Sequence, residues 1–250
     1  IQPLVNQLIR EYKPGAPWES VPLLIDIYRL LKESPQTYWI AQKRKEVKEL
    51  IRLCSGLWLE ATTGTEGLDK GERLTVKTLA VNRSHLDIYF KRLAIDPAGA
   101  DSLIVTRLEA NVPVSITRSF RIPETIPYSQ PYWLRLQPEK AMYHIREDHY
   151  TGLAEAPPVL KAVFTLDIHG ESFEFTVPVE FSGTDPVLGE IRKPFTVRPA
   201  LSINPDKPVS IFPDGEERDL HITLESLADS LEGRIIPRID GNWDVSPSER

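Results

Sequence analysis

The sequence predicts an α+β protein in which N-terminal helices pack on an antiparallel β-sandwich. Apolar residues recur three and four positions apart over residues 1–60, which is typical of helices. From residue 67 onward they alternate with polar residues, which is typical of strands that bury one face. The 22 prolines against 13 glycines favour short strands joined by stiff turns, because proline is excluded from helix interiors and central strands.

The helical region is predicted to span residues 1–66. Its three helices are one that Pro14-Gly15 ends, one from about Glu19 to Lys32 and one from about Tyr38 to Glu60. In the third helix the spacing indicates that Leu50, Ile51, Cys54 and Trp58 are buried, with Trp58 as a structural anchor. Three helices of this size make a thin core, so we expect them to pack on another structure.

Residues 67–199 are predicted to form an immunoglobulin-like sandwich, because short strands with turn signals follow one another without an intervening helix. The expected strands are 74–80, 86–95, 103–108, 112–122, 132–136, 160–169 and 172–181, with a closing strand in 186–199. The last 51 positions, 200–250, hold further strand-like runs at 201–204, 209–212, 220–224 and 233–239. They fall short of the ~100 residues of a complete domain of this type, so they predict an incomplete second sandwich.

Bulk properties exclude several classes of function. A net charge of −6 and a pI near 5.5 argue against a nucleic-acid partner, which needs a concentrated basic surface. No apolar run approaches the ~20 residues of a membrane-spanning helix. Cys54 is alone, which excludes a disulfide framework, and its apolar neighbours indicate an inert thiol. Because the chain starts at Ile1 without methionine, we expect it to be part of a longer protein.

Motifs for catalysis are missing, so we assign no catalytic and no metal-ligating residues. The sequence contains no nucleophile elbow, phosphate-binding glycine loop or dinucleotide fingerprint. The nearest approach to a metal site is the pair His144 and His149, with Glu147 and Asp148 beside the second histidine. A metallohydrolase that uses these histidines is retained as an outside alternative.

Aromatic residues give the more specific signal. Tyr128, Tyr132 and Tyr143 are candidate carbohydrate contacts, because rings can stack on sugar faces. The competing interpretation makes the segment part of the core. In a strand, alternate side chains point to opposite faces, so Trp133 is predicted to point inward as a structural anchor, with Tyr132 and Leu134 on the outer face.

Several strings occur together and in order. They are Lys48-Glu49-Leu50-Ile51-Arg52-Leu53-Cys54-Ser55-Gly56-Leu57-Trp58-Leu59-Glu60-Ala61, Lys70-Gly71-Glu72, Val81-Asn82-Arg83-Ser84, Gln130-Pro131-Tyr132-Trp133-Leu134, Asp185-Pro186-Val187-Leu188-Gly189-Glu190 and Pro194-Phe195. Over most of residues 1–200 the chain thereby resembles the region that follows the catalytic domain in long bacterial members of the PIG-L (LmbE-like) deacetylase family. Residues 233–247, with Gly241-Asn242-Trp243, resemble part of an accessory immunoglobulin-like module of bacterial sugar enzymes.

The resemblance implies a parent protein with a zinc-dependent deacetylase domain that acts on an N-acetylglucosamine-type substrate. The family holds zinc through a His-Pro-Asp-Asp motif, which does not occur in this sequence. We therefore expect a non-catalytic structural and interaction region with no cofactor of its own, whose partner is the parent's own catalytic domain. The resemblance also implies an exported parent. The alternative is a carbohydrate-binding accessory module.

Overall fold

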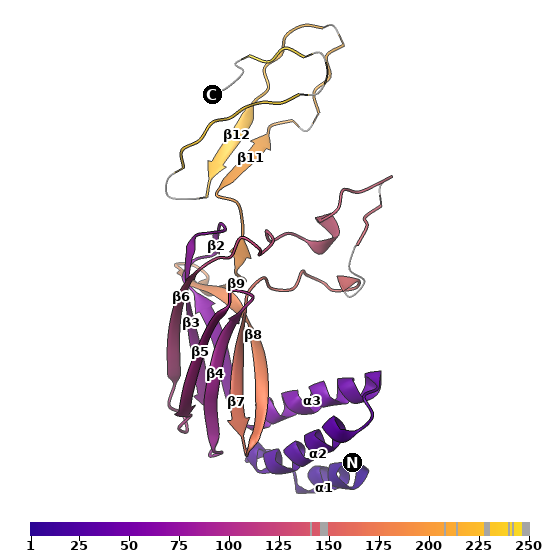
Figure 1. Ribbon diagram of the computed structural model, residues 1–250, viewed down its shortest axis with the longest axis vertical. Helices are drawn as coiled ribbons and strands as arrows, with labels where there is room; N and C mark the ends of the chain where they lie inside the picture. Colours follow the sequence, from indigo (N-terminus) through magenta and orange to yellow (C-terminus); the bar gives the residue numbers. More distant parts are fainter. Residues whose placement is uncertain are drawn as a thin grey trace. The chain divides into compact units, whose positions relative to one another are not determined.

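The computed structural model divides the chain into two compact units, Ile1–Val197 and Arg198–Arg250. It describes residues 1–250 except 141, 146–149, 208, 214, 228–230, 240, 242 and 247–250. The first unit contains a layer of helices and a large β-sheet, and the second contains one strand pair (Figure 1). The predicted α+β class is confirmed.

The helical layer consists of α1 (Gln2–Glu11), the short 3-10 helix η1 (Pro17–Ser20), α2 (Val21–Glu33) and α3 (Tyr38–Cys54). Helix α3 begins where Thr37 Oγ1 accepts a hydrogen bond from the backbone N–H of Ile40, at 3.3 Å, which is an N-cap. Helix α2 contributes most to the core, and its buried residues are Val21, Leu24, Ile25, Ile27 and Leu31.

Helix α3 ends at Cys54, earlier than the sequence spacing predicts. Gly56 adopts a φ of +61°, the left-handed conformation that commonly follows a helix C-terminus. The chain then enters strand β1 (Leu57–Thr63), in which Leu57, Leu59, Ala61 and Thr63 are buried and Trp58 is exposed. The predicted helix up to Glu60 is therefore wrong over residues 55–60, where apolar residues two apart form a strand that buries one face.

The sheet contains eight strands. They are β1, β3 (Arg73–Asn82), β4 (Ile88–Asp96), β5 (Ala100–Arg107), β6 (Val114–Arg121), β7 (Lys161–Ile168), β8 (Glu171–Asp185) and β9 (Gly189–Pro194). The strand order is β5-β4-β7-β8-β1-β3-β6, and β9 also pairs with β8. All of these pairs are antiparallel except β1 with β8, where Ala61 lies opposite Val179 in parallel register. The sheet is therefore mixed.

Strand β8 links the two halves of this sheet. Residues 171–178 pair with β7, residues 179–181 pair with β1, and residues 180–185 pair with β9. Buried residues from both halves, among them Val76 on β3, Phe90 on β4 and Phe164 on β7, belong to one hydrophobic cluster. The rings of Phe90 and Phe164 stack with their centroids 5.4 Å apart. The two halves thus share one core.

The connection from β6 to β7 spans residues 122–160 and contains the 3-10 helix η2 (Tyr132–Leu134). The strand predicted at 132–136 is therefore not formed. Strand β2 (Gly67–Leu68) pairs in parallel with β10 (Thr196–Val197), and the N–H of Ser129 in this connection donates to the carbonyl of Val197 at 2.7 Å.

In the second unit, β11 (Leu201–Pro205) pairs antiparallel with β12 (Ile222–Ser226), which agrees with the strands predicted at 201–204 and 220–224. The runs predicted at 209–212 and 233–239 form no strand.

Candidate interaction surfaces

Tyr128 lies beside the β2–β10 pair and is anchored there. Its hydroxyl donates a hydrogen bond to Asp69 Oδ1 at 3.0 Å, and the Lys70 ammonium lies 4.4 Å from its ring centroid. The hydrogen bond to the Asp69 carboxylate raises the pKa of Tyr128 above its ordinary value. Part of the ring stays exposed, so Tyr128 keeps one surface that a ligand could contact.

Tyr132 is buried, and this overturns the predicted orientation of the aromatic segment. Its hydroxyl donates to the carbonyl of Leu153 at 3.0 Å, and its ring contacts Trp133 edge-on at 4.9 Å and Tyr150 at 5.8 Å. Trp133, which was predicted to be the inward anchor, is partly exposed. Because residues 132–134 form a 3-10 helix, neighbouring side chains do not alternate between two faces as they would in a strand.

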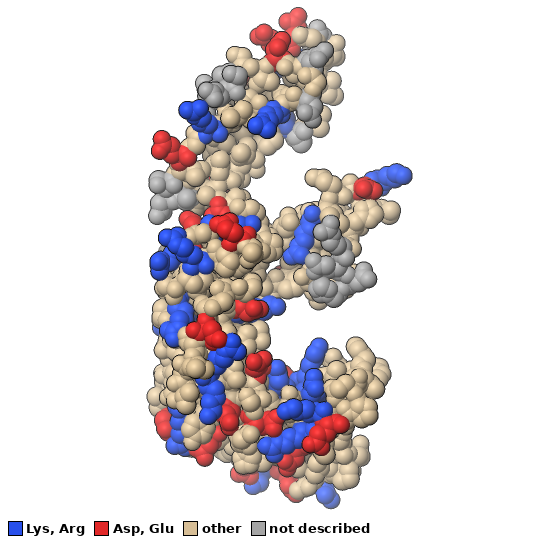
Figure 2. Space-filling model, viewed as in Figure 1, with Lys and Arg blue, Asp and Glu red and all other residues tan. Residues whose placement is uncertain are grey.

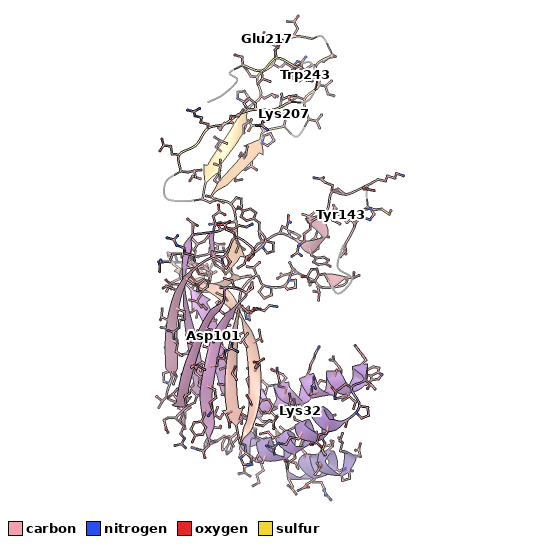
Figure 3. The ribbon with its side chains drawn as sticks, in the orientation of Figure 1. Lys32, Asp101, Tyr143, Lys207, Glu217 and Trp243 are labelled. Carbon is pink, nitrogen blue, oxygen red and sulfur yellow. The ribbon has the colours of Figure 1, made fainter. Side chains whose placement is uncertain are left out.

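Tyr143 is exposed and lies beyond a small turn in the β6–β7 connection (Figure 3). The turn is closed by two backbone hydrogen bonds between Glu139 and Met142, of 3.1 and 2.9 Å. Of the three predicted carbohydrate contacts, Tyr132 is thus occupied by protein neighbours, while Tyr128 and Tyr143 retain exposed ring surface.

Trp58 is 44% exposed and is not the buried helical anchor that the sequence predicts. It points away from the core because it follows Leu57 in β1, where alternate residues face opposite sides. Its indole N–H donates to Glu60 Oε2 at 3.0 Å, and the guanidinium of Arg83 lies 5.3 Å from its ring centroid. Arg192 on β9 binds the same Glu60 oxygen at 3.2 Å. Trp58 therefore belongs to a polar network on the outside of the sheet.

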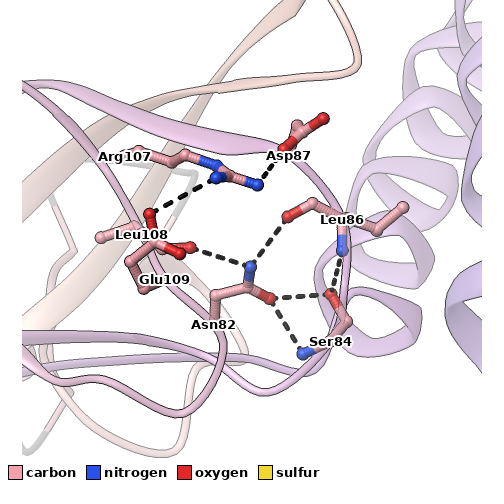
Figure 4. Close-up of polar contacts among 7 residues, drawn as sticks. All are labelled: Asn82, Ser84, Leu86, Asp87, Arg107, Leu108 and Glu109. Carbon is pink, nitrogen blue, oxygen red and sulfur yellow. Dashed lines mark hydrogen bonds and ion pairs between the residues drawn. The ribbon is translucent and has the colours of Figure 1, made fainter.

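Asn82 is the centre of a buried polar network that closes one end of the sheet (Figure 4). Its side-chain amide donates to the carbonyls of Leu86 and Leu108, at 3.0 and 3.1 Å. Its side-chain oxygen accepts hydrogen bonds from the N–H and hydroxyl of Ser84, at 2.9 and 2.7 Å. Sequence analysis identifies Asn82-Arg83-Ser84 only as a turn, but the side chains join the ends of β3, β4 and β5.

Two further expectations concern reactive groups. Burial raises the pKa of the Cys54 thiol, which keeps it protonated and agrees with the predicted inert cysteine.

Of the alternative metal pair, His149 lies outside the described residues, as do Glu147 and Asp148. Within the described part of the chain, no three His, Cys, Asp or Glu side chains are grouped as metal ligands. No helix of that part is long and apolar enough to cross a membrane.

Helix α2 is attached to β8 through ion pairs and through a contact between aromatic rings. Glu171 accepts hydrogen bonds from Arg29 Nε and Lys32 Nζ of α2, each at 3.1 Å. The ring of Tyr28 on α2 contacts the ring of Phe173 at 5.0 Å. These contacts fix α2 to the hairpin between β7 and β8.

Several large apolar side chains of α1 and α3 are exposed. Trp39 on α3 is 71% exposed and contacts Tyr38 edge-on, while Leu50 and Leu53 lie further along the helix with about half of each side chain exposed. On α1 no residue is buried, and Ile9 is exposed. Leu50 and Ile51 were both predicted to be buried; this is confirmed for Ile51 and wrong for Leu50. We define the helical outer face by Ile9, Tyr38, Trp39, Leu50 and Leu53.

Comparison with known proteins gives little similarity. No family model matches the chain, and no curated protein matches it. Among solved structures, the chain is similar to the alkylpurine DNA glycosylase AlkC of Pseudomonas fluorescens bound to DNA that contains an abasic site analogue. The identity is 13% and the TM-score is 0.24, and the match covers 68% of this chain and 48% of that one. The chain thus spans about half the length of that structure.

Proposed function

We propose that this chain is a non-catalytic structural and interaction region of a PIG-L (LmbE-like) family deacetylase. In this proposal the helical outer face binds the parent protein's own catalytic domain. That domain would supply the zinc and the chemistry on an N-acetylglucosamine-type substrate, and the chain would supply no cofactor. The parent would be exported. The family assignment is supported by the ordered family-like strings in residues 1–200. The comparisons with known proteins identify no family.

The single observation that carries the interaction role is the asymmetry of the helical layer. One side is attached to the sheet through Glu171 and Phe173, and α2 is largely buried. The other side exposes Trp39, Leu50 and Leu53, which are residue types that proteins normally remove from water. Large apolar side chains that stay exposed favour an interaction role, and here the charged residues Lys43, Glu46 and Glu49 lie between Trp39 and Leu50 along the helix.

We further propose that the sheet is an immunoglobulin-like sandwich. If the seven long strands β1, β3, β4, β5, β6, β7 and β8 are named A, B, C, C′, E, F and G, the observed order separates A, B and E from C′, C, F and G. The same division between two packed sheets is characteristic of immunoglobulin-like domains. A single core shared by both groups supports the proposal. The parallel pairing of β1 with β8 is the departure from a purely antiparallel sandwich.

A carbohydrate-binding module is the second candidate. The exposed rings of Tyr128 and Tyr143 favour it, since partly exposed aromatics are what sugar faces stack on. The burial of Tyr132 reduces the number of available rings. Titration of N-acetylglucosamine oligomers against the chain and against its Tyr143→Ala variant would measure this function directly.

The docking proposal is tested with the gene that encodes the chain. A His-Pro-Asp-Asp motif in the sequence upstream of Ile1 is expected. The chain should form a complex with that upstream domain when the domain is expressed separately. Trp39→Asp and Leu53→Asp should each weaken the complex. Leu103→Asp, at an exposed position of β5, is the control and should leave the affinity unchanged. An upstream sequence without the motif, or a complex insensitive to both helix variants, would refute the proposal.

A further inference from the structure

Strand β8 has an open edge along its first half. Residues 171–178 pair with β7 on one side, and β1 joins the opposite side only from Val179 onward. Among the described residues, no strand pairs with 171–178 on that opposite side. An open edge presents backbone N–H and C=O groups that can pair with another chain.

Helix α3 lies next to this edge and forms the other wall of a groove (Figure 1). The groove has a volume of about 420 Å³ and is lined by Lys48, Glu49 and Arg52 of α3 and by Phe175, Thr176 and Val177 of β8. The ammonium of Lys48 donates to the carbonyl of Glu174 at 2.6 Å and lies 5.7 Å from the ring centroid of Phe175.

The contact from Lys48 fixes which backbone groups face the groove. In a strand, the N–H and C=O of one residue point to the same side, and successive residues alternate. Because the carbonyl of Glu174 faces Lys48, the N–H and C=O of Thr176 also face the groove, whereas Phe175 and Val177 bond toward β7. Pro178 has no N–H and ends the series.

We propose that this groove binds an extended peptide segment that has an acidic side chain and adds to β8 as a further strand. The N–H groups of Glu174 and Thr176 and the carbonyl of Thr176 face the groove with the two-residue repeat of a strand, which an extended peptide complements, while the carbonyl of Glu174 is bonded to Lys48. Figure 2 shows lysine and arginine side chains over the helices, interspersed with aspartate and glutamate, and the groove itself is lined by the cations Lys48 and Arg52 and by Glu49. Arg52 is paired with Glu49, whereas the ammonium of Lys48 is bonded to a neutral carbonyl, so Lys48 is the cation that favours a carboxylate in the bound segment.

The electrostatic environment of Lys48 supports an acidic partner. Burial lowers the pKa of Lys48 below its ordinary value, although the nearby Glu174 and Glu49 act in the opposite direction and Arg44 adds to the lowering. Arg52 is ion-paired with Glu49, to which it donates from both Nε and Nη2, and its Nη1 donates to the carbonyl of Leu57. A carboxylate that entered the groove would stabilise the charged form of Lys48. This inference is independent of the deacetylase assignment, because it rests only on the strand edge and α3.

The test uses the whole chain labelled with ¹⁵N and a peptide of about eight residues, a common strand length, with alternating valine and threonine and one central glutamate. Binding should slow hydrogen exchange at the amide of Thr176. Thr176→Pro removes the N–H that faces the groove, and an edge position tolerates proline. It should weaken binding about tenfold, since a backbone hydrogen bond is lost. The control Thr176→Val should bind as the original chain does.

Charge reversal provides a test that does not depend on the proline variant. The Lys48→Glu variant should bind the glutamate peptide more weakly than the original chain does. It should bind the same peptide with lysine in place of glutamate more tightly. Absence of peptide binding at millimolar concentration, or binding that leaves the Thr176 amide unchanged, would overturn the proposal. So would a dimer in sedimentation experiments that Thr176→Pro abolishes, because a second copy of the chain would then be the occupant.

Discussion

Arg118 on β6 donates a hydrogen bond from Nε to the hydroxyl oxygen of Ser102 on β5, over 2.6 Å. These two strands are the opposite ends of the strand order, so the bond brings the ends of the sheet together and leaves it nearly closed. The ends meet through side chains and not through a backbone ladder. A side-chain contact therefore links the edges of β5 and β6, while the first half of β8 remains accessible next to α3.

Val105, on the same strand as Ser102, has a φ of +50° and is 67% exposed. It lies at the irregularity where the register between β4 and β5 shifts. A β-branched residue is strained in this left-handed conformation, and glycine is not. Val105→Gly should therefore stabilise the chain by about 1 kcal/mol, measured by urea unfolding.

The matched control is Leu103→Gly, two residues earlier on the exposed face of the same strand. Leu103 has no positive φ, so glycine should lower the free energy of unfolding there. If both variants lose stability equally, the strain at Val105 is absent.

Asn82→Ala should destabilise the first unit strongly. The variant leaves the carbonyls of Leu86 and Leu108 and the hydroxyl of Ser84 without their buried partner. Loss of a buried side chain with several hydrogen bonds is expected to lower the free energy of unfolding by about 2–4 kcal/mol. Chemical denaturation would measure it, with Asn6→Ala on exposed α1 as the control that stays within about 0.5 kcal/mol. A small cost at Asn82 would show that water replaces the side chain.

Acid should weaken the attachment of α2 to the sheet. Burial opposes ionisation of Glu171, whose side chain is only 14% exposed, but the hydrogen bonds from Lys32 and Arg29 outweigh it and hold the pKa of Glu171 below its usual value. A depressed folded-state pKa contributes stability that is present above the unfolded value near 4.5 and is lost as the pH falls through the folded value.

The measurement is the free energy of unfolding of Glu171→Gln and of the original chain at pH 7 and in steps below pH 4.5. The variant should be less stable at neutral pH, and the difference should shrink as the pH falls. Glu33→Gln, an exposed position at the end of α2, serves as the control. A difference that does not change with pH would exclude a role for the ionised carboxylate.

Local patterns predicted much of the fold, and long-range contacts account for the errors. The alternation around Leu74 and Phe90 predicts β3 and β4, and the turn at Gly170 predicts the β7–β8 hairpin, because these elements are stabilised by neighbours close in sequence. Trp58 was misplaced because helical and strand spacing coincide after Cys54, although Gly56 was an available signal for the helix end. The parallel pairing of Ala61 with Val179 has no local signature.

The candidate surfaces were predicted less well for the same reason. Tyr132 is buried and Trp133 is partly exposed, the reverse of the prediction. Contacts between residues distant in sequence, such as Tyr132 with Leu153, determine which of the two side chains is buried. Leu50 was expected to be buried, since the sequence shows that a helix face carries apolar residues but not what covers them. The groove beside Thr176 exists because β1 pairs with β8 only from Val179 onward. This pairing joins residues far apart in the sequence, so the sequence alone does not predict it.

Ile51 and Leu50 are adjacent on α3 and provide the last prediction. Ile51 is fully buried, whereas Leu50 is 46% exposed on the helical outer face. Ile51→Ala should cost about 2–5 kcal/mol in urea unfolding, as a core truncation does, and Leu50→Ala should cost less than about 1 kcal/mol. In the presence of the catalytic domain that we propose as partner, Leu50→Ala should instead weaken the complex, because the side chain would then be covered. Equal costs for the two variants in the isolated chain would mean that Leu50 is buried in solution, and the helical outer face would then be unavailable for docking.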